Sequence, residues 1–106
     1  MHINSLLAYY SEINNFNKKE KLIYGHIVMV GKPVTDREIK DALYGRSADQ
    51  NTVRPRITEL KKKGWLVEVD KVKDRVTGKR VRRVRAVSAE EKQRNEHGEL
   101  VQEVML

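Results

Sequence analysis

Apolar residues recur every three or four positions near the start of the chain. Between residues 3 and 16 they are Ile3, Leu6, Leu7, Tyr10 and Ile13. This is the spacing of one face of an α-helix, so the pattern predicts an N-terminal helix. Two asparagines, Asn15 and Asn17, interrupt it.

A second helix is predicted to begin at Asn17. Glu20 stands three residues later, which is the spacing of a capping box. Gly31 is a natural end for this helix, since glycine tolerates the left-handed conformation that closes many helices. The residues expected to face the core are Leu22, Ile23, Ile27 and Val30.

The segment "PVTDREI" contains the sharpest local pattern in the chain. Thr35 and Glu38 have the spacing of a second capping box, and Val34 and Ile39 that of a hydrophobic staple around it. A short helix is therefore predicted to end near Tyr44 and Gly45, with Ile39, Ala42 and Leu43 buried. Before it, Pro33 and Val34 are expected to form a brief strand, and after it "GRSADQ" (45–50) a turn.

A third core helix is predicted over residues 51–63, with Gly64 at its end. Its apolar positions are i, i+4 and i+7, occupied by Val53, Ile57 and Leu60. Either Asn51 or Thr52 is expected to cap it, so that Pro55 falls in or just after the first turn, where a missing amide costs little. The opposite face is small and polar with basic edges. It carries Asn51, Thr52, Pro55, Thr58, Glu59 and Lys62, flanked by Arg54 and Lys61 on one side and Arg56 and Lys63 on the other.

The remainder predicts a β-hairpin and a last helix. After Gly64 the sequence alternates, and Trp65, Val67 and Val69 are expected to face the core. Thr77 and Gly78 provide the hairpin turn before the second strand, "RVRRVRAV". Ser88 and Glu91 then suggest another capped helix. An apolar ending follows at Leu100, Val101, Val104, Met105 and Leu106.

Positive charge is concentrated in the middle of the chain. The whole chain has 106 residues, a formal charge of +7 and a pI of about 9.8. Residues 46–85 contain 14 Lys and Arg against five Asp and Glu, a net of +9, while the rest of the sequence has a net of −2. Such a concentration indicates a polyanionic partner.

Motifs for catalysis or cofactor binding are missing from the sequence. Cysteine is absent, and the three histidines (His2, His26, His97) lack the spacing of metal ligands. There is neither a Gly-rich phosphate loop nor a nucleophile motif around a serine. We therefore expect no enzyme activity, metal or cofactor. We also expect a cytoplasmic protein, since neither a signal peptide nor a run of about 20 apolar residues is found.

The order of elements from Asn17 to Val87 resembles a winged helix-turn-helix domain. "VTDREIKDAL", a polar turn, "NTVRPRITELKKKGWLVEV" and a basic hairpin are similar to small winged-helix proteins of bacteria and phages, including the MarR-like regulators. The resemblance implies an α+β, mainly α fold with a three-helix core and a hairpin wing. A single domain, 1–106, is expected, comprising this core (17–87), an N-terminal helix (1–16) and a C-terminal helical tail (88–106).

The resemblance also implies a mode of DNA binding. In such proteins the third helix enters the major groove, and the wing lies along the backbone or minor groove. Carried over by position, the helix contacts are Asn51, Thr52, Arg54, Pro55, Arg56, Thr58, Lys61 and Lys62. Those of the wing are Lys73, Arg75, Thr77, Lys79, Arg80 and Arg82. Arg54 has the side chain suited to a two-pronged contact with guanine.

Several biological roles are open to such a protein. A transcriptional regulator in a bacterial cell or phage-infected host is the main hypothesis, and a replication, partition or excision accessory protein would use the same surfaces. A winged-helix module that binds an acidic host protein is a third, and an RNA-binding role a lesser one. A homodimer is possible through Ile3, Leu6, Leu7, Tyr10, Ile13 and the 100–106 tail; alternatively, these segments pack back on the domain.

Overall fold

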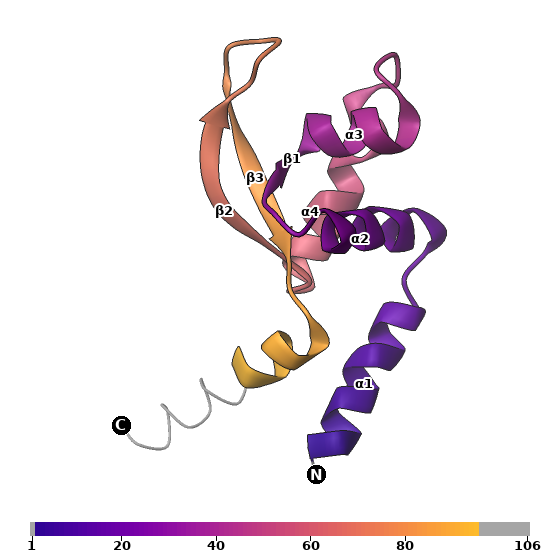
Figure 1. Ribbon diagram of the computed structural model, residues 1–106. Coiled ribbons are helices and arrows are strands. Elements are labelled where there is room, and N and C mark those ends of the chain that lie inside the picture. Colours follow the sequence, from indigo (N-terminus) through magenta and orange to yellow (C-terminus); the bar gives the residue numbers. More distant parts are fainter. Residues whose placement is uncertain (1, 96–106) are drawn as a thin grey trace.

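The structure is a computed structural model that describes residues 2–95, with side chains described from residue 6 onward. It is an α+β arrangement, mainly helical (Figure 1). The elements are α1 (His2–Asn14), α2 (Lys18–Val30), β1 (Val34–Thr35), α3 (Asp36–Tyr44), the 3-10 turn η1 (Gln50–Thr52), α4 (Arg54–Lys62), β2 (Leu66–Lys73) and β3 (Arg80–Ala86). Residues 89–95 are helical as well.

The three strands form one antiparallel sheet in the order β1-β3-β2. The brief strand at Val34 and the hairpin are therefore confirmed. The prediction that Trp65, Val67 and Val69 share the core face is wrong, because Trp65 and Leu66 are both buried while Val67 and Val69 are exposed. Leu66 begins the core-facing side of β2, and an irregularity in the register leaves Val69 without a partner and shifts the alternation.

The core lies between α2, α3, α4 and the sheet. Val53, Ile57 and Leu60 of α4 are fully buried, as their spacing predicted. Two residues that were predicted to be buried, Leu22 of α2 and Ala42 of α3, are exposed, so these two predictions are wrong. On an amphipathic helix only one stripe faces the interior, and α2 buries the stripe of Glu20, Ile23, Tyr24 and Ile27.

Both predicted capping boxes are confirmed. The side chain of Asn17 accepts from the Glu20 amide at 2.8 Å and that of Thr35 from the Glu38 amide at 3.2 Å. In return, the Glu20 and Glu38 carboxylates accept from the amides of Asn17 and Thr35. The predicted cap of α4 is wrong. Residues 50–52 form a 3-10 turn of their own, in which Asp49 accepts from the Asn51 amide, and α4 starts after it without a side-chain cap.

The terminal segments, α1 and residues 89–95, both contact Trp65 and lie at the opposite end of the molecule from the hairpin turn (Figure 1). Glu12 of α1 accepts a hydrogen bond from Trp65 Nε1 at 2.9 Å, and the rings of Trp65 and Tyr9 form a T-shaped contact. Lys92 lies 4.3 Å from the centre of the Trp65 ring, in a segment that Ser88 caps as predicted. Helix α1 thus packs back on the domain. The Ile3 side chain, His97 and the 100–106 tail lie outside what the structure describes.

Candidate nucleic-acid interface

Helix α4 and the hairpin lie side by side, joined by Arg82 of β3. The Arg82 guanidinium donates to both carboxylate oxygens of Asp36 at 3.2 and 3.1 Å and to the Thr58 hydroxyl at 3.1 Å. Asp36 is the first residue of α3 and Thr58 lies on α4. One side chain therefore holds together the hairpin, the start of α3 and the middle of α4.

The flank of α4 that faces the sheet is used within the protein. Arg54, Thr58 and Lys61 are spaced i, i+4 and i+7 along it. Arg54 Nε is 3.9 Å from Asp36, and Lys61 Nζ is 3.0 Å from Glu68 of β2. Of the DNA contacts expected here, Thr58 and Lys61 are engaged internally, whereas 55% of the Arg54 side chain is exposed.

The other flank of α4 is also paired with acids. Arg56 binds Glu59, one turn along the same helix, at 3.0–3.1 Å. Lys63 donates to the buried carboxylate of Glu20 at 2.8 Å, which ties the end of α4 to α2. Burial raises the pKa of Glu20, but the hydrogen bonds from Lys63 and from the Asn17 amide outweigh it and hold that pKa below its usual value.

Between the two flanks, the outward ridge of α4 and η1 is open to solvent. Asn51, Pro55 and Lys62 are exposed, and Thr52 is half-buried. Lys62 has no acidic partner within residues 6–95. The ridge therefore combines short polar or rigid side chains at its start with an unpaired lysine at its end.

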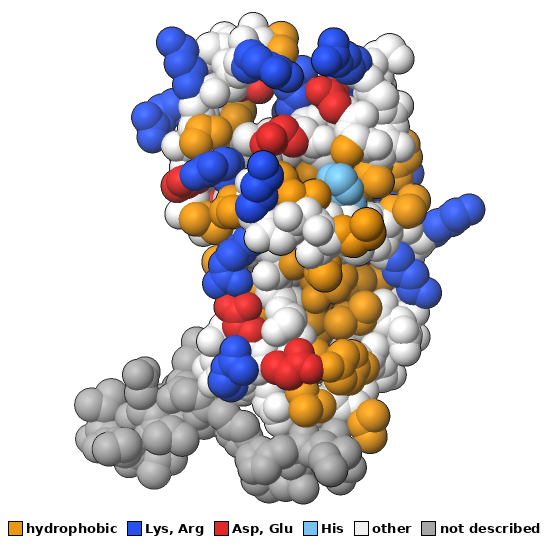
Figure 2. All heavy atoms as spheres, in the orientation of Figure 1, with side chains coloured by type: hydrophobic (Ala, Val, Ile, Leu, Met, Phe, Trp, Pro, Cys, Tyr) orange, Lys and Arg blue, Asp and Glu red, His pale blue; other side chains and the backbone are white. Residues whose placement is uncertain are grey.

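The outer half of the hairpin carries the largest share of unpaired positive charge. Seven of the 14 basic residues in 46–85 have an acidic partner within the described residues. The seven without one are Arg46, Lys62, Lys71, Lys73, Arg75, Lys79 and Arg80. Five of these lie between residues 71 and 80, and Figure 2 shows Lys and Arg side chains gathered at this end of the molecule.

The hairpin turn is organised around Asp74, the one acid in that stretch. Its carboxylate accepts from the Thr77 amide at 2.8 Å, the Thr77 hydroxyl at 2.9 Å and Arg37 Nε of α3 at 2.9 Å. These hydrogen bonds, the Thr77 amide first, lower the pKa of Asp74 to about 2. Thr77, expected as a wing contact, thus shapes the turn, and the Asp74 charge is matched by Arg37.

A second surface feature lies near the terminal segments. A groove of about 600 Å³ runs between α1, α2 and residues 85–90, with Tyr10, Val28 and Ala89 among its lining residues. Tyr24, another lining residue, donates to the Val87 carbonyl at 2.7 Å, and burial raises the pKa of Tyr24 to about 12. Leu7 and Met29 are exposed on the same two helices. Hydrophobic side chains form a band over α2 and α1 in Figure 2.

Two residues of the interface were missed by the sequence reasoning. Asp36 follows the cap of α3, where an acid is explained by the helix dipole alone, and nothing local connects it with Arg82. Arg37 stands next to it and gives no local sign of its bond to Asp74. Correlated changes of residue type between such distant positions are the signal that could have found both contacts.

Within the part of the chain that the structure describes, no group of His, Asp or Glu is arranged to hold a metal ion, and no helix combines the length and apolar character needed to cross a bilayer. In comparisons with family models, curated proteins and solved structures, nothing matches the chain.

Proposed function

We propose that the chain is a winged-helix DNA-binding protein, a small transcriptional regulator of the bacterial or phage type. In this proposal α4 lies in the major groove and the hairpin lies along the backbone or minor groove. The protein acts by occupying DNA, and no chemical step is involved.

The observation that carries the proposal is the Arg82 junction. Because Arg82 binds Asp36 and Thr58 together, α4 and the hairpin form one continuous surface. A duplex needs such a surface, since a helix in one groove and a ribbon on the neighbouring backbone must keep a constant spacing. In this proposal Thr58 and Arg82 position the two elements, and neighbouring residues of α4 and the hairpin contact the DNA.

The two elements supply different parts of the binding free energy. On η1 and α4, Asn51 and Pro55 permit a close approach, and the exposed Arg54 reads a base edge. The unpaired lysines and arginines of the hairpin suit phosphates, which position a protein without reading sequence. If Lys62 and the five hairpin residues each neutralise one phosphate, log affinity falls with a slope of about −5 against log salt.

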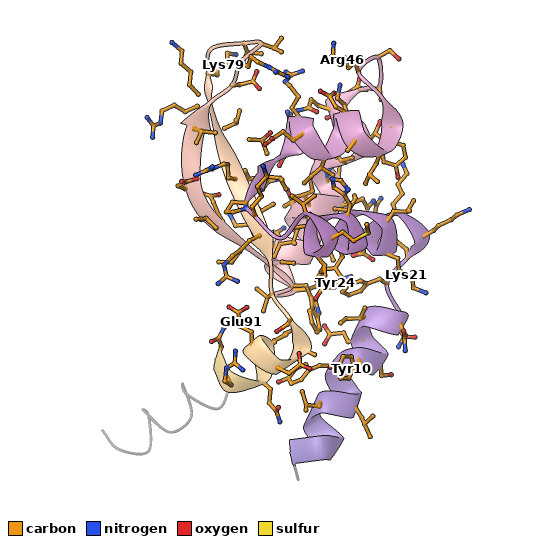
Figure 3. The ribbon with its side chains drawn as sticks, in the orientation of Figure 1. Tyr10, Lys21, Tyr24, Arg46, Lys79 and Glu91 are labelled. Atoms are coloured by element: carbon orange, nitrogen blue, oxygen red, sulfur yellow. The ribbon has the colours of Figure 1, made fainter. Side chains whose placement is uncertain are left out.

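Selection of bound fragments from random duplex tests the proposal directly. At about 0.15 M salt, where specific and nonspecific binding separate, we expect a preferred site to emerge. The substitution Arg54→Ala should then cost about 1–3 kcal/mol against this site and blur one base position. Lys21→Ala, which removes an exposed cation of α2, is the matched control (Figure 3).

The outcomes of this experiment are distinct. A wild-type protein that retains no duplex at this salt concentration refutes DNA binding. A protein that binds duplex, with Arg54→Ala and Lys21→Ala indistinguishable on specific and random sequence, leaves DNA binding standing but removes the reading role from Arg54.

We propose in addition that the regulator is a homodimer, because a single winged helix gives limited specificity and two-fold sites are usual. On α1, Leu6 and Ile13 pack against the core, whereas Leu7 and Tyr10 are exposed. Val28 and Met29 of α2 extend the apolar surface next to them, so we place the dimer contact on this face.

A further inference from the structure

A hollow between α3 and the hairpin turn is lined mainly by basic side chains. It has a volume of about 430 Å³. Its lining residues are Arg37, Lys40, Asp41, Arg46, Arg75 and Val76. Arg46 belongs to the connection between α3 and α4, and Arg75 to the hairpin turn, so segments far apart in the sequence meet here. Figure 3 shows Arg46 at the same end of the molecule as Lys79 of the hairpin.

Two of the four basic side chains in the lining, Arg37 and Lys40, are held in place by other residues of the protein. Arg37 donates through Nε to Asp74, and neither of its terminal nitrogens forms a hydrogen bond with a described residue. Lys40 is almost fully buried; it donates to the Arg46 carbonyl and forms an ion pair with Asp41, both at 2.8 Å. The Lys40 ammonium thus neutralises the one carboxylate in the lining and fixes the backbone of Arg46.

The remaining two cations have no such partner. Arg46 and Arg75 are exposed, and neither forms an ion pair with residues 6–95. With Asp41 matched by Lys40, the hollow keeps the uncompensated charges of Arg46 and Arg75 beside the guanidinium edge of Arg37. Like charges gathered around one concave site repel each other, and a bound anion relieves that repulsion.

We propose that this hollow binds one phosphate of the DNA backbone, gripped jointly by Arg46 and Arg75 and supported by Arg37. The inference rests on the proposed function and deepens it: Arg75, already counted among the hairpin's phosphate contacts, shares its phosphate with Arg46, which lies outside both α4 and the hairpin. Guanidinium groups suit it, because their planar fork donates two parallel hydrogen bonds to phosphate oxygens. The volume lies within the range of about 300–1,000 Å³ typical of ligand sites, enough to admit the phosphate with part of its sugar.

A salt-dependence experiment with two single variants and their double variant tests the site. The affinity for a random-sequence duplex is measured by fluorescence anisotropy between about 0.05 and 0.3 M salt for wild type, Arg46→Ala, Arg75→Ala and the double variant. Lys21→Ala is again the control. Thermal unfolding confirms that each variant is folded, as expected for exposed side chains without internal partners.

The expected result follows from counting phosphates. Each phosphate neutralised contributes about 0.9 to the slope of log affinity against log salt. If both arginines bind the same phosphate, the slope of the double variant falls by about one. The losses of the two single variants then do not add up. A loss of nearly two, equal to the sum of the singles, means two separate phosphates and overturns the shared site.

Other outcomes separate this inference from the proposed function. If wild type binds duplex and all three variants keep its slope, the hollow is not a DNA contact while DNA binding stands. If wild type binds no duplex, the proposed function itself fails. Titration with inorganic phosphate, followed by NMR of the arginine Nε groups, tests whether the hollow binds a free phosphate ion instead. Binding of free phosphate, with the salt slope for duplex unchanged in all three variants, assigns the hollow to a small anion and overturns the proposal.

Discussion

Replacing Arg82 with alanine is expected to destabilise the fold. Arg82 lies in the hairpin among residues predicted to touch DNA, yet its guanidinium makes three hydrogen bonds within the protein. The side chains of Arg82 and Asp36 are 19% and 11% exposed, so water screens this pair less than an ordinary surface ion pair. Among the described residues, alanine would leave the Asp36 carboxylate with only Arg54, at 3.9 Å.

The size of the effect can be worked out from this geometry. Hydrogen bonds to charged groups contribute about 1.5–3 kcal/mol, and breaking a fully buried ion pair costs about 3–5 kcal/mol. The Arg82 pair is partly exposed and Arg54 remains nearby, so we expect a loss of about 2 kcal/mol in the free energy of unfolding. For a chain of this size, that lowers Tm by about 10 °C.

Urea unfolding followed by circular dichroism measures the loss. A double-mutant cycle with Asp36→Ala isolates the pair and should give a coupling free energy of about 1–2 kcal/mol. Lys79→Ala, in the same hairpin but without an acidic partner in the described chain, should change stability by no more than about 0.5 kcal/mol. If Arg82→Ala unfolds at the wild-type midpoint while its DNA affinity falls, Arg82 is a DNA contact and its structural role is refuted.

Three further predictions concern the hairpin, α4 and the apolar face. Hydrogen bonds from Thr77 and Arg37 lower the pKa of Asp74 from 3.8 to about 2, so its stabilisation of the turn is complete above pH 3.8 and lost as the pH falls toward 2. NMR titration of the carboxyl group should show this midpoint, and Arg37→Ala should raise it; an unchanged midpoint contradicts the assigned cause. Lys62→Ala should flatten the slope of log affinity against log salt by about one, and Lys61→Ala by less, since Lys61 is held by Glu68. Equal changes would show that this ion pair does not keep Lys61 from contacting DNA. Sedimentation equilibrium should find a dimer that Leu7→Lys with Met29→Lys dissociates, whereas a wild-type monomer at all concentrations rules the dimer out.

Local patterns in the sequence were enough to predict most elements of this protein, although not the 3-10 turn η1. The caps at Asn17 and Thr35, the buried stripe of α4 and the turn at Thr77 and Gly78 are all found in the structure. Each depends on residues within about four positions of one another, where helix and turn geometry fix the distances. The cap of α4 failed at the same scale, because a 3-10 turn competed for Asn51 and Thr52.

Only the tertiary structure decided which charges are available to a partner. Lys63, Arg82 and Arg75 are all basic residues of the same central segment, but Lys63 binds Glu20, 43 positions away, and Arg82 binds Asp36, 46 positions away. Trp65 likewise meets Glu12 across 53 positions, which turns α1 inward. Ion pairs and hydrogen bonds form only over a few ångströms, so contacts between remote segments exist once the chain has packed and leave no periodic trace in the sequence.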